Sequence, residues 1–149
     1  MITAERTLDA GVCLDVLTNK VIFNAISEDG ATFENLVINV FSDYWVKLLD
    51  GQDVVGVAQF KPMFNKCYDC HIHILPEHRK QHSMGAGRAL IDWCKGSLPD
   101  CLLFTTVPNF CPNVIAFLKA FDFEESGALK GAWKKNGKQN DMTILTRGI

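Results

Sequence analysis

The four histidines of the chain, His71, His73, His78 and His82, all lie within twelve residues. Side chains alternate between the two faces of a strand, so Asp69, His71 and His73 would share one face. An imidazole titrates near neutral pH and can accept a proton from a reacting group, directly or through a water. The spacing indicates a proton-transfer site. The alternative is a solvent-facing or internally satisfied polar face.

A basic junction that contains two glycines follows these histidines. We predict that a strand ends at Pro76 and that a helix covers Ser83–Leu98, with Gly85 and Gly87 in its first turn. Helix N-termini present free N–H groups and a partial positive charge, and glycines let an anion approach them. The cations within reach are Arg79, Lys80 and Arg88. The junction therefore indicates a site for a phosphate group.

Two common phosphate motifs do not fit this junction. A dinucleotide fingerprint would need a third glycine where Leu90 stands, and a P-loop would need Gly-Lys-Ser/Thr, whereas Gly87 is followed by Arg88 and Ala89. The alternative interpretation of the glycines is a helix whose small residues allow close packing.

Hydrophobic periodicity and turn residues divide the chain into helices and strands. The predicted elements are two short helices within Leu8–Ile26, strands at Tyr44–Leu49, Val54–Phe60 and Cys67–Leu75, the helix at Ser83–Leu98, a buried strand at Cys101–Val107, a short helix from Pro112 to Phe121, and strands at Lys130–Lys135 and Asp141–Arg147. A strand–helix–strand unit with antiparallel hairpins on either side indicates a mixed α+β domain.

The length and amino-acid composition of the chain indicate a single folded domain. The 149 residues fit one domain, and 48% hydrophobic with 21% charged residues excludes a disordered chain. A formal net charge of −2 argues against a whole-domain nucleic-acid clamp. The chain contains no apolar run of about 18 residues that would span a membrane. Six irregularly spaced cysteines and the absence of an N-terminal export signal predict reduced thiols in a cytoplasm, the host cytoplasm if the chain is phage-encoded.

The segment Gly85-Ala86-Gly87-Arg88-Ala89-Leu90, after a strand that ends in Pro76, resembles the acetyl-CoA loop of the Gcn5-related N-acetyltransferase (GNAT) superfamily. The resemblance continues to Phe121-Asp122-Phe123-Glu124 and covers roughly residues 8–147. The chain also resembles a tailed-phage branch of this superfamily, through the turn at Asp29-Gly30, His71, and an ending with Gly131-Ala132-Trp133 and Leu145-Thr146-Arg147. Some members of that branch carry a head-assembly label. The resemblance implies a mostly antiparallel sheet with one parallel strand pair, flanked by helices.

The resemblance also implies a set of contacts to acetyl-CoA. Backbone N–H groups at the start of the long helix would bind the pyrophosphate, and the backbone at the end of the third strand would bind the pantetheine arm, where two parallel strands splay apart. The implied residues are Ile74, Leu75, His82, Ser83, Met84, Gly85, Ala86, Gly87 and Arg88. The chain departs from the family pattern at His82, where the family has Arg or Gln, and in the greater distance from Pro76 to the glycines.

The resemblance places the strand of His71 beside the acetyl group. We predict that His71 is the base, with Asp69 orienting it or acting through a water. The tyrosine that usually protonates the departing thiolate falls on Leu118. Cys111, at the start of a helix that could acidify its thiol, is one candidate acid, and Tyr68 is another.

Cys67-Tyr68-Asp69-Cys70-His71 matches the string for covalent haem attachment. Cys67 and Cys70 would point to opposite faces of a strand and could not chelate one ion together. We therefore expect no metal and no haem.

Together these observations predict transfer of an acetyl group from acetyl-CoA to a primary amine on a small molecule or a protein. The alternative is a non-catalytic protein of the same fold that acts in phage head assembly or host-protein binding. The acceptor would be selected by Leu36–Ser42, the first helices and the last hairpin. Exposed strands near the C-terminus are compatible with a homodimer.

Overall fold

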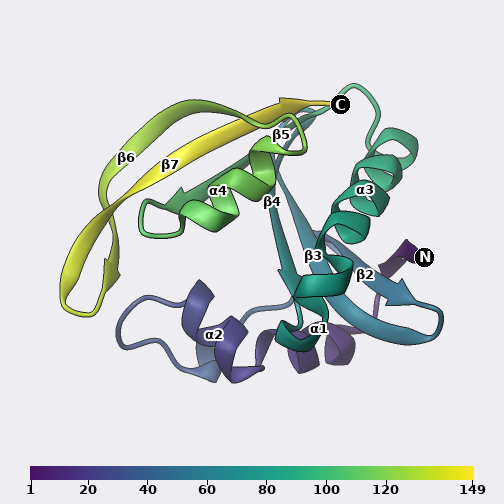
Figure 1. The fold of residues 1–149 in the computed structure, drawn as a ribbon, viewed down its shortest axis with the longest axis horizontal. Helices are drawn as coiled ribbons and strands as arrows, with labels where there is room; N and C mark the ends of the chain where they lie inside the picture. The colour runs from purple at the N-terminus through teal and green to yellow at the C-terminus, as the bar shows by residue number, and fades with distance from the viewer.

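A seven-stranded sheet in the order β1-β2-β3-β4-β5-β7-β6 forms the centre of the protein (Figure 1). The computed structural model describes all residues, 1–149. The strands are β1 (Ile2–Thr7), β2 (Tyr44–Asp50), β3 (Asp53–Phe64), β4 (Cys67–Ile74), β5 (Leu102–Pro108), β6 (Glu124–Lys135) and β7 (Lys138–Gly148). The helices are α1 (Ala10–Leu17), α2 (Lys20–Ile26), α3 (Arg79–Ser97) and α4 (Pro112–Lys119), with single 3-10 turns η1 (Phe33–Asn35) and η2 (Pro76–His78). The mixed α+β architecture is confirmed.

Two tight turns set the register of the outer hairpins. Gly51 joins β2 to β3 with a φ of 63°, and Asn136 and Gly137 join β6 to β7 with φ values of 53° and 74°. Positive φ at two successive residues, as at Asn136 and Gly137, belongs to a type I′ turn, whose twist matches that of the flanking strands. Both predicted hairpins are confirmed. The last one is longer than predicted, because β6 begins at Glu124 and β7 ends at Gly148.

The sheet contains one parallel pair, β4 with β5. Their pairing joins Cys67, Tyr68 and Asp69 to Leu102, Leu103 and Phe104, and it ends there. β4 continues to Ile74 and β5 continues to Pro108, so the second halves of the two strands diverge. The predicted splay is confirmed.

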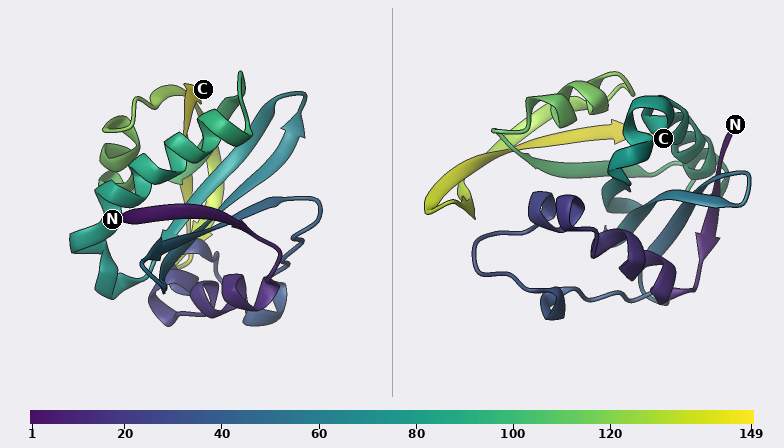
Figure 2. Two further views of the ribbon diagram at one scale, coloured as in Figure 1. Left: turned by 90° about the vertical axis from the view of Figure 1, so that its right-hand side faces the viewer. Right: turned by 60° about the horizontal axis from the view of Figure 1, so that its bottom comes forward.

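Helices cover both faces of the sheet (Figure 2). α3 and α4 lie over the face that carries the larger core cluster, which includes Val46, Leu103 and Leu145. α1 and α2 lie over the opposite face, where Trp45 and Val57 belong to a smaller cluster. Because successive residues of a strand alternate between faces, Cys70 packs in the larger cluster while its neighbours in sequence face α1 and α2.

Three elements differ from the prediction. β1 was not predicted; it pairs antiparallel with β2 at one edge of the sheet, from Ile2 opposite Asp50 to Thr7 opposite Trp45. β5 is not fully buried, because its side chains alternate between buried and partly exposed positions. α3 begins at Arg79, four residues before the predicted start at Ser83.

The early start of α3 has a local cause. Pro76 opens the 3-10 turn η2, in which the His78 amide donates to the carbonyl of Leu75 at 2.9 Å. The Arg79 amide donates to the carbonyl of Pro76, and the chain passes from η2 directly into α3. The N-cap residue, His78, makes no side-chain cap, so no capping residue marks this boundary in the sequence.

The tip of the β6–β7 hairpin is fastened to the segment after α2. The Asp29 carboxylate accepts from the amides of Asn136 and Gly137 at 2.8 and 2.7 Å. Lys135 Nζ donates to the carbonyl of Ser27 at 2.7 Å. We call these three bonds the hairpin-tip contacts. They hold the tip of the last hairpin beside the loop that follows α2 (Figure 1). None of the helices has both the length and the hydropathy needed to cross a membrane.

Candidate active site

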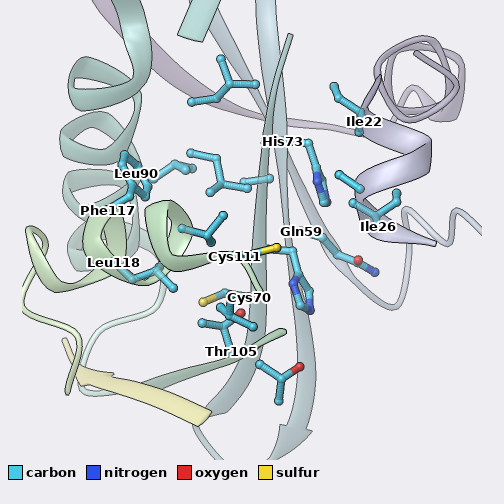
Figure 3. A pocket seen from close by; sticks show the side chains of 18 of the residues that line it. Ile22, Ile26, Gln59, Cys70, His73, Leu90, Thr105, Cys111, Phe117 and Leu118 are labelled. Carbon is cyan, nitrogen blue, oxygen red and sulfur yellow. The ribbon is translucent and has the colours of Figure 1, made fainter. Parts of the chain in front are cut away.

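A cavity of about 860 Å³ opens where β4 and β5 diverge. It reaches from α3 and α4 on one face of the sheet to α2 on the other. In Figure 3, Ile22 and Ile26 lie on the α2 side, and Leu90, Phe117 and Leu118 lie on the side of α3 and α4. Hydrophobic side chains make up 26 of its 37 lining residues. A cavity of this size and apolar character suits a small-molecule ligand.

His71 and Asp69 lie together at this cavity, as the alternation of β4 predicts. His71 Nε2 is 3.1 Å from Asp69 Oδ1, and the side chains are 35% and 25% exposed. The ring N–H is not aimed at the oxygen, so the buried Asp69 Oδ1 has no hydrogen-bond partner. His71 lines the cavity, and Asp69 stands behind it. The pair can hold a proton at His71 next to a carboxylate.

Gln59 and Asp43 extend this polar group onto β3 and the segment before β2. Gln59 is directly opposite His71 in the β3–β4 register, and its Nε2 donates to Asp43 Oδ2 at 2.7 Å. Asp43 is buried, whereas Gln59 lines the cavity. The sequence analysis did not identify Gln59. The sequence feature that could have identified Gln59 is a polar residue at an inward-facing position of the predicted strand Val54–Phe60.

His73 also lines the cavity, and its ring stacks beside that of His71 with centroids 6.4 Å apart. Burial, with smaller contributions from the neighbouring His71 and Arg79, lowers the pKa of His73 to about 3. The imidazole is therefore uncharged at neutral pH, and its weak basicity makes it a poor proton acceptor. Of the two histidines on this wall, His71 therefore remains the candidate for the predicted base.

Gly85 and Gly87 lie inside α3 and not in its first turn. A Cβ atom at Gly87 would come within 2.3 Å of the Phe121 ring, and one at Gly85 would lie 3.3 Å from Ile2 of β1. The amides of Ser83–Arg88 fall within the helix, where the carbonyl four residues earlier is their ordinary partner. Close packing explains both glycines, and the predicted pyrophosphate contact remains a prediction.

The other predicted cofactor residues divide into two groups. Ile74, Ser83 and Gly87 line the cavity. Six do not line it: Leu75, His82, Met84, Gly85, Ala86 and Arg88.

Several of these residues already have partners within the protein. The Ile74 carbonyl accepts from Arg79 Nε at 3.0 Å, and the Leu75 amide donates to the carbonyl of Val55 at 2.9 Å. His82 Nε2 lies 3.6 Å from Asp50 Oδ2, toward β2.

Cys111 is the N-cap of α4 and lines the cavity, where Figure 3 shows its sulfur between the two sides. The prediction that the helix would acidify this thiol is wrong, because burial raises the pKa of Cys111. The thiol is protonated at neutral pH and can donate a proton. Leu118 lines the cavity, but neither tyrosine of the chain does. Burial raises the pKa of Tyr68, with smaller contributions from Tyr44 and Cys101.

The structure places no three His, Cys, Asp or Glu side chains in position to share a metal ion.

Arg79 also lines the cavity, at the start of α3. The sequence analysis named Arg79 as one of three cations at the junction, and it is the one whose position reaches the cavity.

No protein-family model matches the chain, and no curated protein sequence matches it. Solved structures do match over nearly the whole length. The chain is 19% identical to spermidine N-acetyltransferase from Vibrio cholerae in complex with CoA and spermine, with a TM-score of 0.80 over 99% of this chain and 95% of that one. It is 10% identical to an acetyltransferase of the GNAT family from Streptococcus pneumoniae, with a TM-score of 0.75 over 100% and 99% of the two chains.

A third likeness is to ribosomal-protein-alanine N-acetyltransferase from Brucella melitensis, at 15% identity and a TM-score of 0.74 over 98% of this chain and 99% of that one. At these identities the likeness shows the fold. The chain has the GNAT fold, in agreement with the resemblance of its sequence.

Proposed function

We propose that the chain is an acetyl-CoA-dependent N-acetyltransferase that transfers an acetyl group to a primary amine by direct attack. The observation that carries this proposal is the cavity at the split between β4 and β5, with His71 at its wall and Asp69 beside His71. The fold is shared with proteins named as N-acetyltransferases, one of them in complex with CoA. Fold likeness alone does not assign an activity, so the proposal depends on the cavity and its side chains.

The lining fits a pantetheine arm. It is mostly apolar, and Ile74, Ser83 and Gly87 border it along β4 and α3. The phosphate groups would then lie near the first turn of α3. A helix N-terminus carries a partial positive charge, and the side chains of Arg79 and Lys80 are exposed cations there. The proposed phosphate contacts are therefore one turn earlier than the glycines suggested.

When bound, acetyl-CoA would supply an acyl group already activated as a thioester. His71 would accept the proton of the attacking amine. Since Nε2 lies beside Asp69, the nitrogen left for the amine is Nδ1. The Asp69 carboxylate would then stabilise the imidazolium that forms. Cys111, whose thiol is protonated, is the candidate donor to the departing thiolate.

Thermal unfolding with and without acetyl-CoA tests cofactor binding, with NAD and ATP as controls. Saturating acetyl-CoA should raise the Tm by about 5–10 °C, since ligand at a hundredfold excess over its Kd stabilises a protein by about 2.7 kcal/mol. Transfer is then measured as release of the CoA thiol with a panel of primary amines. His71→Ala should reduce release by about 10²–10⁴-fold and keep the thermal shift. His78→Ala, which removes a histidine outside the cavity, should change neither.

The alternative is a non-catalytic protein of this fold that serves phage head assembly or host-protein binding. It is favoured by Leu118, which occupies the cavity wall where the family pattern has a tyrosine, and by the absence of any tyrosine from the lining. Under this alternative, acetyl-CoA at millimolar concentration would leave the Tm unchanged.

A further inference from the structure

The charged groups around the cavity have an unusual distribution. None of the 37 lining residues is Asp, Glu or Lys, and Arg79 is the one permanently charged side chain among them. Most of the lining on the side of α2 is apolar, from Ile22 and Ile26 of α2, Leu36 and Ile38 of the following loop, and Met142 of β7. Asn35 and Gln59 add uncharged polar groups there. The wall therefore offers no carboxylate along which a second ammonium group could lie.

Carboxylates in the segments next to this wall, such as Glu34, already accept hydrogen bonds within the protein. Asp29 accepts two amides of the hairpin tip, and Glu28 accepts from the amide of Lys134 at 2.8 Å. Asp43 accepts from Gln59. The exception is Asp69, whose buried Oδ1 has no hydrogen-bond partner and lies beside His71. Asp69 is the partner of His71 and does not line the cavity, so no carboxylate is left there for a second amine.

The surroundings of His73 are a second indication that this wall disfavours a positive charge. Burial is the main reason that its pKa falls to about 3, so this part of the cavity disfavours a positive charge. A second ammonium placed here would lose its hydration without gaining a partner, a cost of several kcal/mol for an unpaired ion. An apolar group would instead lose water on binding, which is favourable.

We infer that the acceptor is a primary amine on an uncharged, largely apolar body, such as an arylalkylamine, and not a polyamine. This inference rests on the proposed function of the cavity. It separates the chain from the solved structure bound to spermine, whose fold it shares.

Amine binding can be measured apart from transfer. Isothermal titration of 2-phenylethylamine and of spermidine into protein saturated with CoA should give at least tenfold tighter binding of 2-phenylethylamine. That result supports the inference even where no acetyl group is transferred, in which case only the proposed function fails. Equal or tighter binding of spermidine, or no binding of 2-phenylethylamine, would overturn the inference.

A matched pair of variants tests the location of the acceptor. Val37 is 80% exposed and lines the cavity, whereas Val21 is 52% exposed on α2 and does not line it. Val37→Glu supplies the missing carboxylate and should raise the affinity ratio of spermidine to 2-phenylethylamine at least tenfold. Val21→Glu adds the same charge nearby and should leave the ratio unchanged. Equal effects of the two substitutions would contradict the assignment of this wall.

Discussion

Replacing His73 with glutamine should flatten the pH dependence of stability on the acid side of neutrality. His73 has a pKa of about 3 in the folded protein, against an ordinary value of 6.5. Between these values the unfolded chain binds a proton at residue 73 and the folded protein does not. The free energy of unfolding therefore falls as the pH falls through this range, and is fully restored above the unfolded pKa.

The size of the effect follows from the two pKa values. Linkage gives a loss of at most about 2 kcal/mol from His73 between pH 7.5 and pH 5. For a domain of this length, such a loss lowers the Tm by roughly 4–8 °C. The side chain keeps part of its surface open to the cavity, and for that reason we take the figure as an upper bound.

Urea unfolding at pH 7.5 and pH 5, followed by tryptophan fluorescence, measures the difference directly. The wild-type protein should lose more stability on acidification than His73→Gln, by up to the amount above. His78→Gln makes the same replacement outside the cavity and serves as the control. The reasoning is wrong if His73→Gln and the wild-type protein lose the same stability over this interval.

Three further substitutions test other parts of the structure. Gly87→Ala should destabilise the protein by about 1–3 kcal/mol in urea unfolding, because the new Cβ would overlap the Phe121 ring. In the control Gly96→Ala the new Cβ meets nothing within 4 Å, so this change should be neutral or stabilising by up to about 1 kcal/mol. Equal effects at the two sites would contradict the close packing of α3. His71→Ala should reduce CoA release by about 10²–10⁴-fold, and a smaller loss would remove it as the base. Asp29→Ala should speed hydrogen exchange of the two amides at the hairpin tip. The two amides lower the pKa of Asp29, so their bonds to it in the wild-type protein should also weaken as the pH falls through that lowered pKa. If exchange of these amides responds neither to Asp29→Ala nor to the fall in pH, Asp29 does not hold the hairpin tip.

Short sequence patterns were sufficient to predict much of the fold. Asp50-Gly51 and Asn136-Gly137 allow the positive φ values that tight hairpins need, and both hairpins form there. The period of two along β4 placed Asp69 and His71 on one face, and they lie 3.1 Å apart. These features depend on residues close together in sequence, which is why the sequence predicts them.

Features without a clear sequence signal, or dependent on distant residues, were not predicted. The start of α3 has no capping side chain, and Ser83 is the residue type that often begins a helix. β1 is a short edge strand that is stabilised by pairing with β2, some forty residues later. The contact of Gly87 with Phe121 and the raised pKa of Cys111 are both consequences of tertiary packing. No local pattern contains that information.

The hairpin-tip contacts also bear on the order in which the protein folds. They join residues 107 and 108 positions apart in the chain. Closing so long a loop costs conformational entropy before any bond forms, so such contacts form late and slow the folding of a domain. In synthesis from the N-terminus, β1 to β5 can assemble before residue 136 leaves the ribosome. The cavity wall contributed by Trp133 and Met142 is then the last part to be built, and a chain that is cut short before the hairpin would have a sheet without a complete binding site.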